Sequence, residues 1–498
     1  MERILPLFVI IPVFSAVSTL LVSRWERRKF PRIWSILTVS SLIVLLYFIW
    51  NKGVLVHEMG GWKAPFGIVM IKDSLTRFML LIINGVALIT LLYSYSYILK
   101  REDYLRFFSM FLLMLAGMNG VALTGDLFNL FIFLEIASIA SYVLVGYDIG
   151  AEELEAAFKY LIMGVLASMC ILIGIAIVYS VTGSVNMADI ARFIEANNIV
   201  DNKAILMATG LFILGFGLKA GFVPFHAWLP DAHPSAPAPI SAMLSGVLIK
   251  SLGIYPLIRI FYNVIPMSPV VSNIFIFLGS LSMIVGALMG SGQIDIKRLF
   301  AFHSVSQMGY IIVGVGLGTP LGLIGALFHL LNHSVFKSLL FLSSGAIQSS
   351  TGTRNMKELG GLRERMPVTS GSAVVGALSI SGVPPFNGFW SKLIIILAAF
   401  QAKNMWAAAA LVLTAFLTLM CFVKFQRHAI FGKMSDTVKR SKEAPLPMLM
   451  SLVIMGLLCL LIGLFNQNII TSIIAPAQEV LLDKGAYIMS VLGMAGGG

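Results

Sequence analysis

The sequence predicts an all-α polytopic membrane protein with about fourteen transmembrane helices. Of its 498 residues, 58% are hydrophobic and only 12% are charged, whereas soluble domains carry roughly 25% charged residues. Apolar runs of about 20 residues recur along the whole chain, and each can cross a hydrocarbon core of roughly 30 Å. Hydropathy alone therefore places this chain in a membrane.

The expected spans follow one another with short connections. Their approximate centres are Phe14, Ile43, Asn84, Leu115, Ala137, Ile171, Ile213, Leu248, Leu278, Ile311, Phe336, one broken span from 378 to 395, Leu413 and Met455. We expect four units: an N-terminal group of three helices, two groups of five helices, and a C-terminal unit. Their bounds are 1–104, 105–262, 270–428 and 429–498.

Two stretches differ from simple spans. Residues 53–72 contain Gly60, Gly61 and Pro65, which predicts a hairpin on the outer face. Residues 469–494 are amphipathic, and such a segment lies along the membrane surface or packs on a neighbouring subunit.

The basic loops fall on alternate connections and predict the orientation. They lie at 24–32, 100–106, 297–298, 354–365 and 427–442. By the positive-inside rule these loops are cytoplasmic, so both termini lie outside. The acidic segment 148–155 opposes this assignment, but acidic residues weigh little in the rule. The net charge of +12 is then explained by basic loops and does not imply nucleic-acid binding.

Lysines lie inside apolar runs interrupted by prolines. Lys219 ends one run and Lys250 lies inside the next, with five prolines in between. A lysine at the bilayer centre costs roughly 2.5–3.5 kcal/mol on insertion scales, so a functional role is expected. The alternatives are a lysine that reaches the headgroups or one that closes a structural ion pair.

The chain also contains an internal repeat. Glu135-IASIASYVLV-Gly146 aligns with His303-SVSQMGYIIV-Gly314, and Gly221-FVPFHAW aligns with Gly382-VPPFNGFW. Each of the latter motifs interrupts an apolar span, and Pro224, Pro384 and Pro385 mark the interruptions. Paired broken helices at matching positions indicate an ion path near the midplane, and five spans per repeat would invert the topology. Chance similarity between apolar segments is the alternative.

Titratable residues follow these elements along the chain. Glu135 lies between apolar stretches, where a nearby lysine would keep it ionised, and Lys219 is the candidate. His329, His333 and Lys337 share one helix face at spacings of four residues, and Lys392 follows the second interruption. Groups of this type can pass protons through intervening water. The two histidines also have a zinc-like spacing, but neither an HExxH motif nor a third ligand accompanies them.

We further expect non-helical residues at 219–224 and 381–388, at mid-membrane depth. Lys250, the histidine face and Lys392 should lie at similar depth along a line parallel to the membrane. Cys170, Cys421 and Cys459 are far apart in apolar runs, which predicts neither a disulfide framework nor an iron–sulfur site.

The motif KAGFVPFHAWLPDAHPSAPAPISAMLSGVLIK closely resembles the signature of the proton-translocating, antiporter-like membrane subunits of respiratory complex I. The same family includes subunits of Mrp-type cation/proton antiporters and membrane-bound hydrogenases. The resemblance extends over almost the whole chain, through GDLFNLFIFLEIASIASY, LFAFHSVSQMGY, LFHLLNHSVFKSLLFLSSG and SGVPPFNGFWSK. It implies fourteen transmembrane helices with two inverted five-helix repeats, in which helices 7 and 12 are broken.

The resemblance also implies roles for individual residues. Glu135 and Lys219 match the family's glutamate–lysine pair, and Lys250 matches the lysine of the central axis. His329, His333 and Lys337 match the groups of helix 11, and Lys392 matches the exit residue of helix 12. One complex I branch has glutamate at that last position, so this chain departs from it.

These observations predict an ion-translocating subunit of a multisubunit complex in the cell membrane, with other membrane subunits and lipids as partners. It moves protons, with coupling to Na⁺ open, and has no cofactor or redox chemistry of its own. Length and pattern fit the D-type subunit of Mrp antiporters or its counterpart in hydrogenase-like and sulfur-reducing complexes. The alternatives are a subunit that binds quinone or a redox centre, and a structural scaffold.

Overall fold

The computed structural model describes residues 1–21, 29–98 and 103–493. Within them, thirteen helices are long and apolar enough to cross a membrane. Two shorter helices separated by a break, α16 (Pro367–Ser381) and α17 (Asn387–Gln401), together supply the remaining crossing. The fold class predicted from the sequence is therefore confirmed. The basic connections expected at 24–32 and 100–106 lie partly outside the described residues, as does the last residue of the expected tail, Met494.

The N-terminal part contains η1 (Glu2–Ile4), α1 (Leu7–Leu21), α2 (Phe30–Ile49), β1 (Leu55–Glu58), η3 (Met59–Gly61), β2 (Val69–Lys72) and α3 (Ser74–Tyr97). It is followed by α4 (Tyr104–Leu123), α5 (Leu127–Val145), α6 (Ala151–Thr182), α7 (Met187–Ala196), α8 (Lys203–Ala220) and α9 (Leu229–Ser235). The next span is continuous but changes between α- and π-helix; its segments are α10 (Ala238–Met243), η4 (Leu244–Leu248), η5 (Lys250–Ile254), α11 (Tyr255–Arg259) and η6 (Ile260–Val264).

The second half begins with α12 (Pro269–Ser291), α13 (Ile296–Gly316), α14 (Pro320–Thr351), η7 (Met356–Glu358) and α15 (Leu362–Arg365). After α16 and α17 come α18 (Met405–Phe425) and η8 (Gln426–Ile430). The chain closes with α19 (Asp436–Lys439), α20 (Leu446–Leu464), α21 (Asn466–Ile469), η9 (Ile470–Ile474), α22 (Ala475–Leu482) and α23 (Lys484–Leu492).

The two halves of the chain have helices of matching length and matching helix caps, as expected for a structural repeat. α6 and α14 both have 32 residues and end at glycines in the left-handed conformation, Gly183 and Gly352. Asp126 caps α5 and pairs with Asn186 through an isolated antiparallel bridge, and Asp295 caps α13 and pairs with Asn355 in the same way. Short polar side chains at these positions satisfy the first free N–H groups of a helix.

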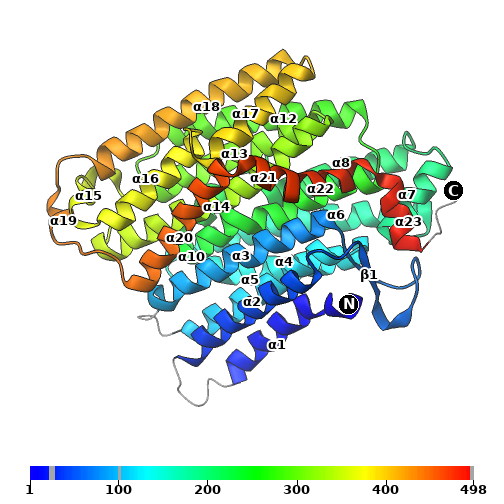
Figure 1. Ribbon diagram of the computed structural model, residues 1–498, viewed down its shortest axis with the longest axis horizontal. Helices are drawn as coiled ribbons and strands as arrows, with labels where there is room; N and C mark the ends of the chain where they lie inside the picture. The colour runs from blue at the N-terminus through cyan, green and yellow to red at the C-terminus, as the bar shows by residue number, and fades with distance from the viewer. Residues whose placement is uncertain (22–28, 99–102, 494–498) are drawn as a thin grey trace.

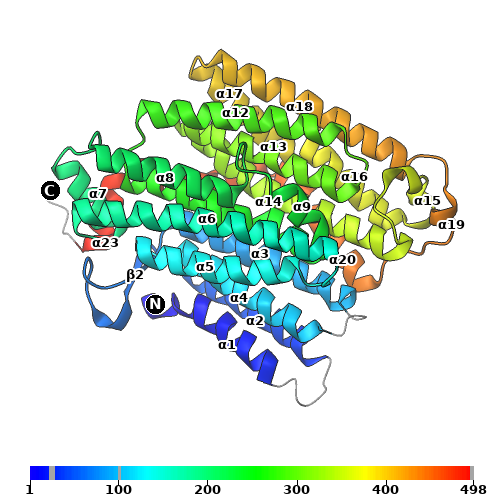
Figure 2. The same ribbon diagram turned by 180° about the vertical axis from the view of Figure 1, so that it is seen from behind.

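The two halves have opposite orientations in the bundle. α7, which follows α6, lies at the end of the molecule that carries both termini and the hairpin, whereas α15, which follows α14, lies at the opposite end (Figure 1). The inverted repeat is therefore visible in the arrangement of equivalent elements. Figure 2 shows α5, α6 and α8 side by side, in agreement with their packing contacts.

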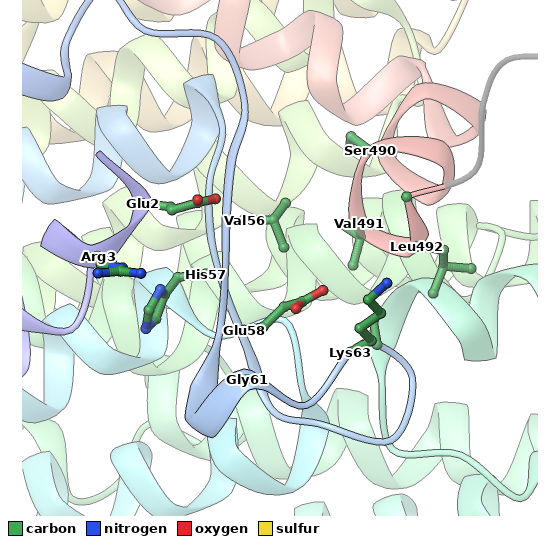
Figure 3. A pocket seen from close by; sticks show the side chains of 12 residues that line it. Glu2, Arg3, Val56, His57, Glu58, Gly61, Lys63, Ser490, Val491 and Leu492 are labelled. Carbon is green, nitrogen blue, oxygen red and sulfur yellow. The ribbon is translucent and has the colours of Figure 1, made fainter.

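The expected hairpin is formed by β1 and β2, which pair antiparallel with Leu55 opposite Lys72. A hollow of about 510 Å³ lies between this hairpin, the N-terminus and α23 (Figure 3). Its lining includes the charged side chains of Glu2, Arg3, Glu58 and Lys63. The hollow lies at the end of the bundle, so it is separate from the lysines in the middle of the spans.

The amphipathic tail packs on the helices of its own chain. α22 packs against α3 and α14, and α23 packs against α7. Asn263 donates a side-chain hydrogen bond to the carbonyl of Val480 at 2.8 Å. Lys484 lies 3.7 Å from Glu195. These contacts attach the tail to helices of the N-terminal part and of both repeats.

A buried ion pair lies beneath the tail. Arg259 contacts the Asp73 carboxylate at 2.7 Å, and both side chains are almost completely buried. Arg259 also donates to Asn263 at 3.1 Å and lies 5.3 Å from the ring of Tyr487. The sequence alone did not indicate this pair, because the two residues are far apart in the chain.

We expect Asp73→Asn to lower the free energy of unfolding by about 3–5 kcal/mol, the cost of leaving a buried charge without its partner. Asparagine keeps the hydrogen bond that Asp73 accepts from the N–H of Thr76 at 2.7 Å, which caps α3. The substitution therefore measures the loss of the negative charge alone. Asp103→Asn is the matched control, because both side chains of its pair with Arg106 are about half exposed and the pair should contribute about 0–1 kcal/mol. Denaturation of the purified protein measures both, and equal effects would contradict the prediction.

Candidate functional site

The first site is the pair formed by Glu135 on α5 and Lys219 on α8. Their side-chain O and N atoms, Oε1 and Nζ, are 3.5 Å apart. Lys219 also donates to Ser138 Oγ at 2.9 Å and to Tyr142 Oη at 3.3 Å, and Ser168 Oγ donates to Glu135. The pairing expected from the sequence is confirmed, and three hydroxyl groups that the sequence analysis did not assign complete it.

Lys219 itself is buried, but the Glu135 side chain is 25% exposed in the single chain. The lysine therefore does not reach the headgroups, and its positive charge is balanced inside the bundle. Burying such a pair is favourable only when further hydrogen bonds satisfy it, and the hydroxyls of Ser138, Tyr142 and Ser168 supply these.

The breaks in the seventh and twelfth transmembrane helices, which follow α8 and α16, begin later than expected. α8 continues through Lys219 to Ala220, and α16 continues through Ser381. Each helix ends where a glycine, Gly221 or Gly382, adopts the left-handed conformation that favours glycine. The expectation that residues 219–220, 381 and 387–388 are non-helical was wrong. The two glycines, rather than the prolines, end the first half-helices, and the second half-helix α17 already begins at Asn387.

The prolines lie inside the breaks as predicted. Pro224 follows α8, and Pro384 and Pro385 lie between α16 and α17. The Val223–Pro224 and Pro384–Pro385 peptide bonds are both cis, and they occupy aligned positions of the repeat.

Side chains satisfy carbonyl groups near the two breaks. The Trp228 indole donates to the carbonyl of Leu218 at 2.9 Å. The Lys392 ammonium donates to the carbonyl of Ile380 at 2.6 Å. Carbonyl groups that lose their helical partners inside a membrane need such hydrogen bonds. At the second break, the charged side chain of Lys392 supplies one.

Lys250 lies at the start of the π-helical segment η5 and is fully buried. Its ammonium donates to the carbonyls of Ser245 at 2.6 Å and Gly246 at 2.8 Å. Like Lys219, Lys250 does not extend to the membrane surface. Its partners are neutral carbonyls, in contrast to the carboxylate that balances Lys219.

Three titratable groups lie along α14, as predicted. Lys337 donates to the carbonyl of Phe300, the rings of His333 and His329 are 6.3 Å apart, and His329 Nδ1 is 2.9 Å from Ser391 Oγ. Ser391 precedes Lys392, whose ammonium lies 5.0 Å above the ring of Tyr310. The structure therefore brings the histidine face and Lys392 together.

Lys337 and His329 are separated along the continuous helix α14. This helix runs from Pro320 to Thr351, and eight residues advance a helix by about 12 Å. The expectation that Lys250, the histidine face and Lys392 lie at one membrane depth stays a prediction.

Several nitrogens in this row have no hydrogen-bonding partner among the described residues. They include both ring nitrogens of His333 and Nε2 of His329. Buried polar groups in native proteins nearly always have a hydrogen-bonding partner. Where no protein group is available, an ordered water molecule is the partner. No cluster of three or more histidine, cysteine or acidic side chains with metal-ligand geometry occurs in the described ranges.

The fold and this site define a class: a polytopic membrane protein with an inverted repeat, two broken helices and a row of buried ionisable groups. The family described as NADH:quinone oxidoreductase/Mrp antiporter matches residues 124–418. A second family, described as the N-terminus of chain 5 of NADH-ubiquinone oxidoreductase (complex I), matches residues 57–108. This chain belongs to the NADH:quinone oxidoreductase/Mrp antiporter family.

The D-type subunit of the Na(+)/H(+) antiporter of Alkalihalophilus pseudofirmus is 33% identical over 91% of this chain and 92% of that protein. A chain of the Mrp complex from Dietzia sp. superposes with a TM-score of 0.91 at 28% identity, covering 99% of both chains. A chain of the membrane-bound sulfane sulfur reductase, an archaeal respiratory membrane complex, gives the same TM-score and identity over 98% of this chain and all of that chain.

Proposed function

We propose that this chain is the ion-translocating membrane subunit of a multisubunit complex and that it moves protons along its buried ionisable groups. The main support for this proposal is that Lys250, Lys337 and Lys392 are buried and donate to backbone carbonyls. A lysine without a counterion at that depth is costly, and it can exchange a proton with a neighbouring group.

The path begins at the pair Glu135–Lys219 and continues through Lys250 to the groups on α14. From His329 it passes by Ser391 to Lys392. Each five-helix repeat, 105–262 and 270–428, supplies one half of the path, and the segments 1–104 and 429–498 flank it. The complex resides in the cell membrane with both termini of this chain outside.

Its partners are other membrane subunits of an Mrp-type, hydrogenase-like or sulfur-reducing assembly. The similarity to chains of an Mrp complex and of a sulfur reductase supports this proposal. Isolation of the native complex separates the three kinds of assembly. Subunits that carry iron–sulfur clusters would indicate a redox-driven pump, whereas small hydrophobic subunits alone would indicate a cation/proton antiporter.

Half-paths that open to opposite sides are expected near the two breaks, the cytoplasmic one at the first break and the outer one near Lys392. Phe225→Cys and Phe386→Cys place a thiol at aligned positions of the two breaks, in a variant that lacks Cys170, Cys421 and Cys459. A membrane-impermeant thiol reagent added outside should label Phe386→Cys faster. Faster labelling of Phe225→Cys from outside would show that the assigned directions are reversed.

A further inference from the structure

A polar column on α13 runs beside the titratable groups of α14. His303 and Gln307 lie one turn apart and are fully buried, and Tyr310 lies in the next turn. Both ring nitrogens of His303 and both amide atoms of Gln307 have no hydrogen-bonding partner among the described residues. Groups of this kind, buried within reach of each other, are satisfied by bridging water.

One end of this column adjoins Lys337. The Lys337 ammonium donates to the carbonyl of Phe300, which lies three residues before His303 on the same helix. The ring of Phe422 stacks on Phe300 at 5.8 Å and lies 5.0 Å from the ring of His303. A side chain at Gly290 would place its Cβ 3.0 Å from His303 Nε2, so glycine at this position leaves room for the imidazole.

The other end of the column adjoins Lys392. The Tyr310 ring lies 5.0 Å from Lys392 Nζ and 5.3 Å from the ring of His329. His303 therefore lies on α13 between Phe300, whose carbonyl accepts from Lys337, and Tyr310, whose ring lies beside Lys392.

The repeat gives an independent reason to assign His303 a role in ion movement. His303 aligns with Glu135, the carboxylate that pairs with Lys219 and accepts from Ser168 in the first repeat. The second repeat therefore has an imidazole where the first has a carboxylate.

We propose that His303, positioned by Gln307, forms a second proton relay between Lys337 and Lys392, parallel to the His333–His329 relay. The inference rests on the proposed function. A proton leaves the Lys337 ammonium and adds to one ring nitrogen of His303 through water. The other ring nitrogen then releases its proton toward the neutral amine of Lys392. The imidazole ends neutral with its N–H exchanged, and no bond between heavy atoms changes.

The test measures proton movement in everted vesicles that contain the complete complex in a host without its own copy. His303→Gln keeps hydrogen-bonding capacity but cannot carry a proton, and it should lower the rate severalfold. His303→Gln combined with His329→Gln should lose far more than the product of the single effects, because parallel relays compensate for each other. Ser306→Ala is the matched control, since its buried hydroxyl donates to Met283 at 3.0 Å on another face.

Added imidazole should partly restore the rate of His303→Ala, which a packing role would not allow. An unchanged rate in His303→Gln, or a defect in His303→Ala that imidazole does not relieve, would overturn the relay. Lys392→Ala distinguishes the two levels of inference. If Lys392→Ala abolishes transport while the His303 variants are normal, only the relay fails; if Lys392→Ala transports normally, the proposed function fails.

Discussion

Replacing Glu135 by alanine should abolish ion transport by the assembled complex while leaving assembly largely intact. Glu135 is the carboxylate beside the buried Lys219 ammonium. Leaving a buried charge without its partner costs about 3–5 kcal/mol. If that amount enters the barrier for ion transfer, the rate falls by on the order of a hundredfold or more.

Glu135→Gln refines this experiment, because glutamine retains the shape and the hydrogen bond with Ser168 but not the charge. We expect it to fail like Glu135→Ala. Glu195→Gln is the control, since Glu195 is an exposed acidic residue of α7 outside the buried row. Transport is measured as pH change in everted vesicles, with the amount of assembled complex determined in parallel. Normal transport by Glu135→Ala would contradict the assignment of this pair.

Much of the fold could be predicted because hydropathy and turn chemistry act locally. Apolar runs determine the spans, and Gly221 and Gly382 each lie beside prolines in an otherwise apolar segment. The boundaries of the breaks were predicted less well, since the sequence does not show that these glycines adopt the left-handed conformation and end the helices.

The site was predicted by residue type but not by contact. Lys219 could be paired with Glu135 because a buried carboxylate needs a cation. The carbonyl partners of Lys250 and Lys392 could not be predicted, because every residue has a carbonyl and only the π-helix at Lys250 and the break before Lys392 make particular ones accessible. The hydroxyl of Ser168 and the pair Asp73–Arg259 depend on how distant helices meet, which no local pattern contains.

Lys250→Arg should abolish transport as completely as Lys250→Ala. The Lys250 ammonium is a compact donor held between two carbonyls at 2.6 and 2.8 Å. A guanidinium is a larger planar fork, and it does not release its proton in proteins. If Lys250 holds a proton only transiently, arginine keeps the positive charge but blocks its transfer.

The comparison of Lys250→Arg with Lys250→Ala separates charge from proton transfer. A requirement for positive charge alone would leave Lys250→Arg active and Lys250→Ala inactive, and this result would contradict proton transfer through the site. Lys203→Arg, at the exposed start of α8, controls for the same chemical change away from the path and should transport normally. Initial rates of pH change in vesicles, normalised to assembled complex, decide between the two outcomes. Because Lys250 lies between Lys219 and the groups of α14 in the proposed order, its loss should stop movement through both halves.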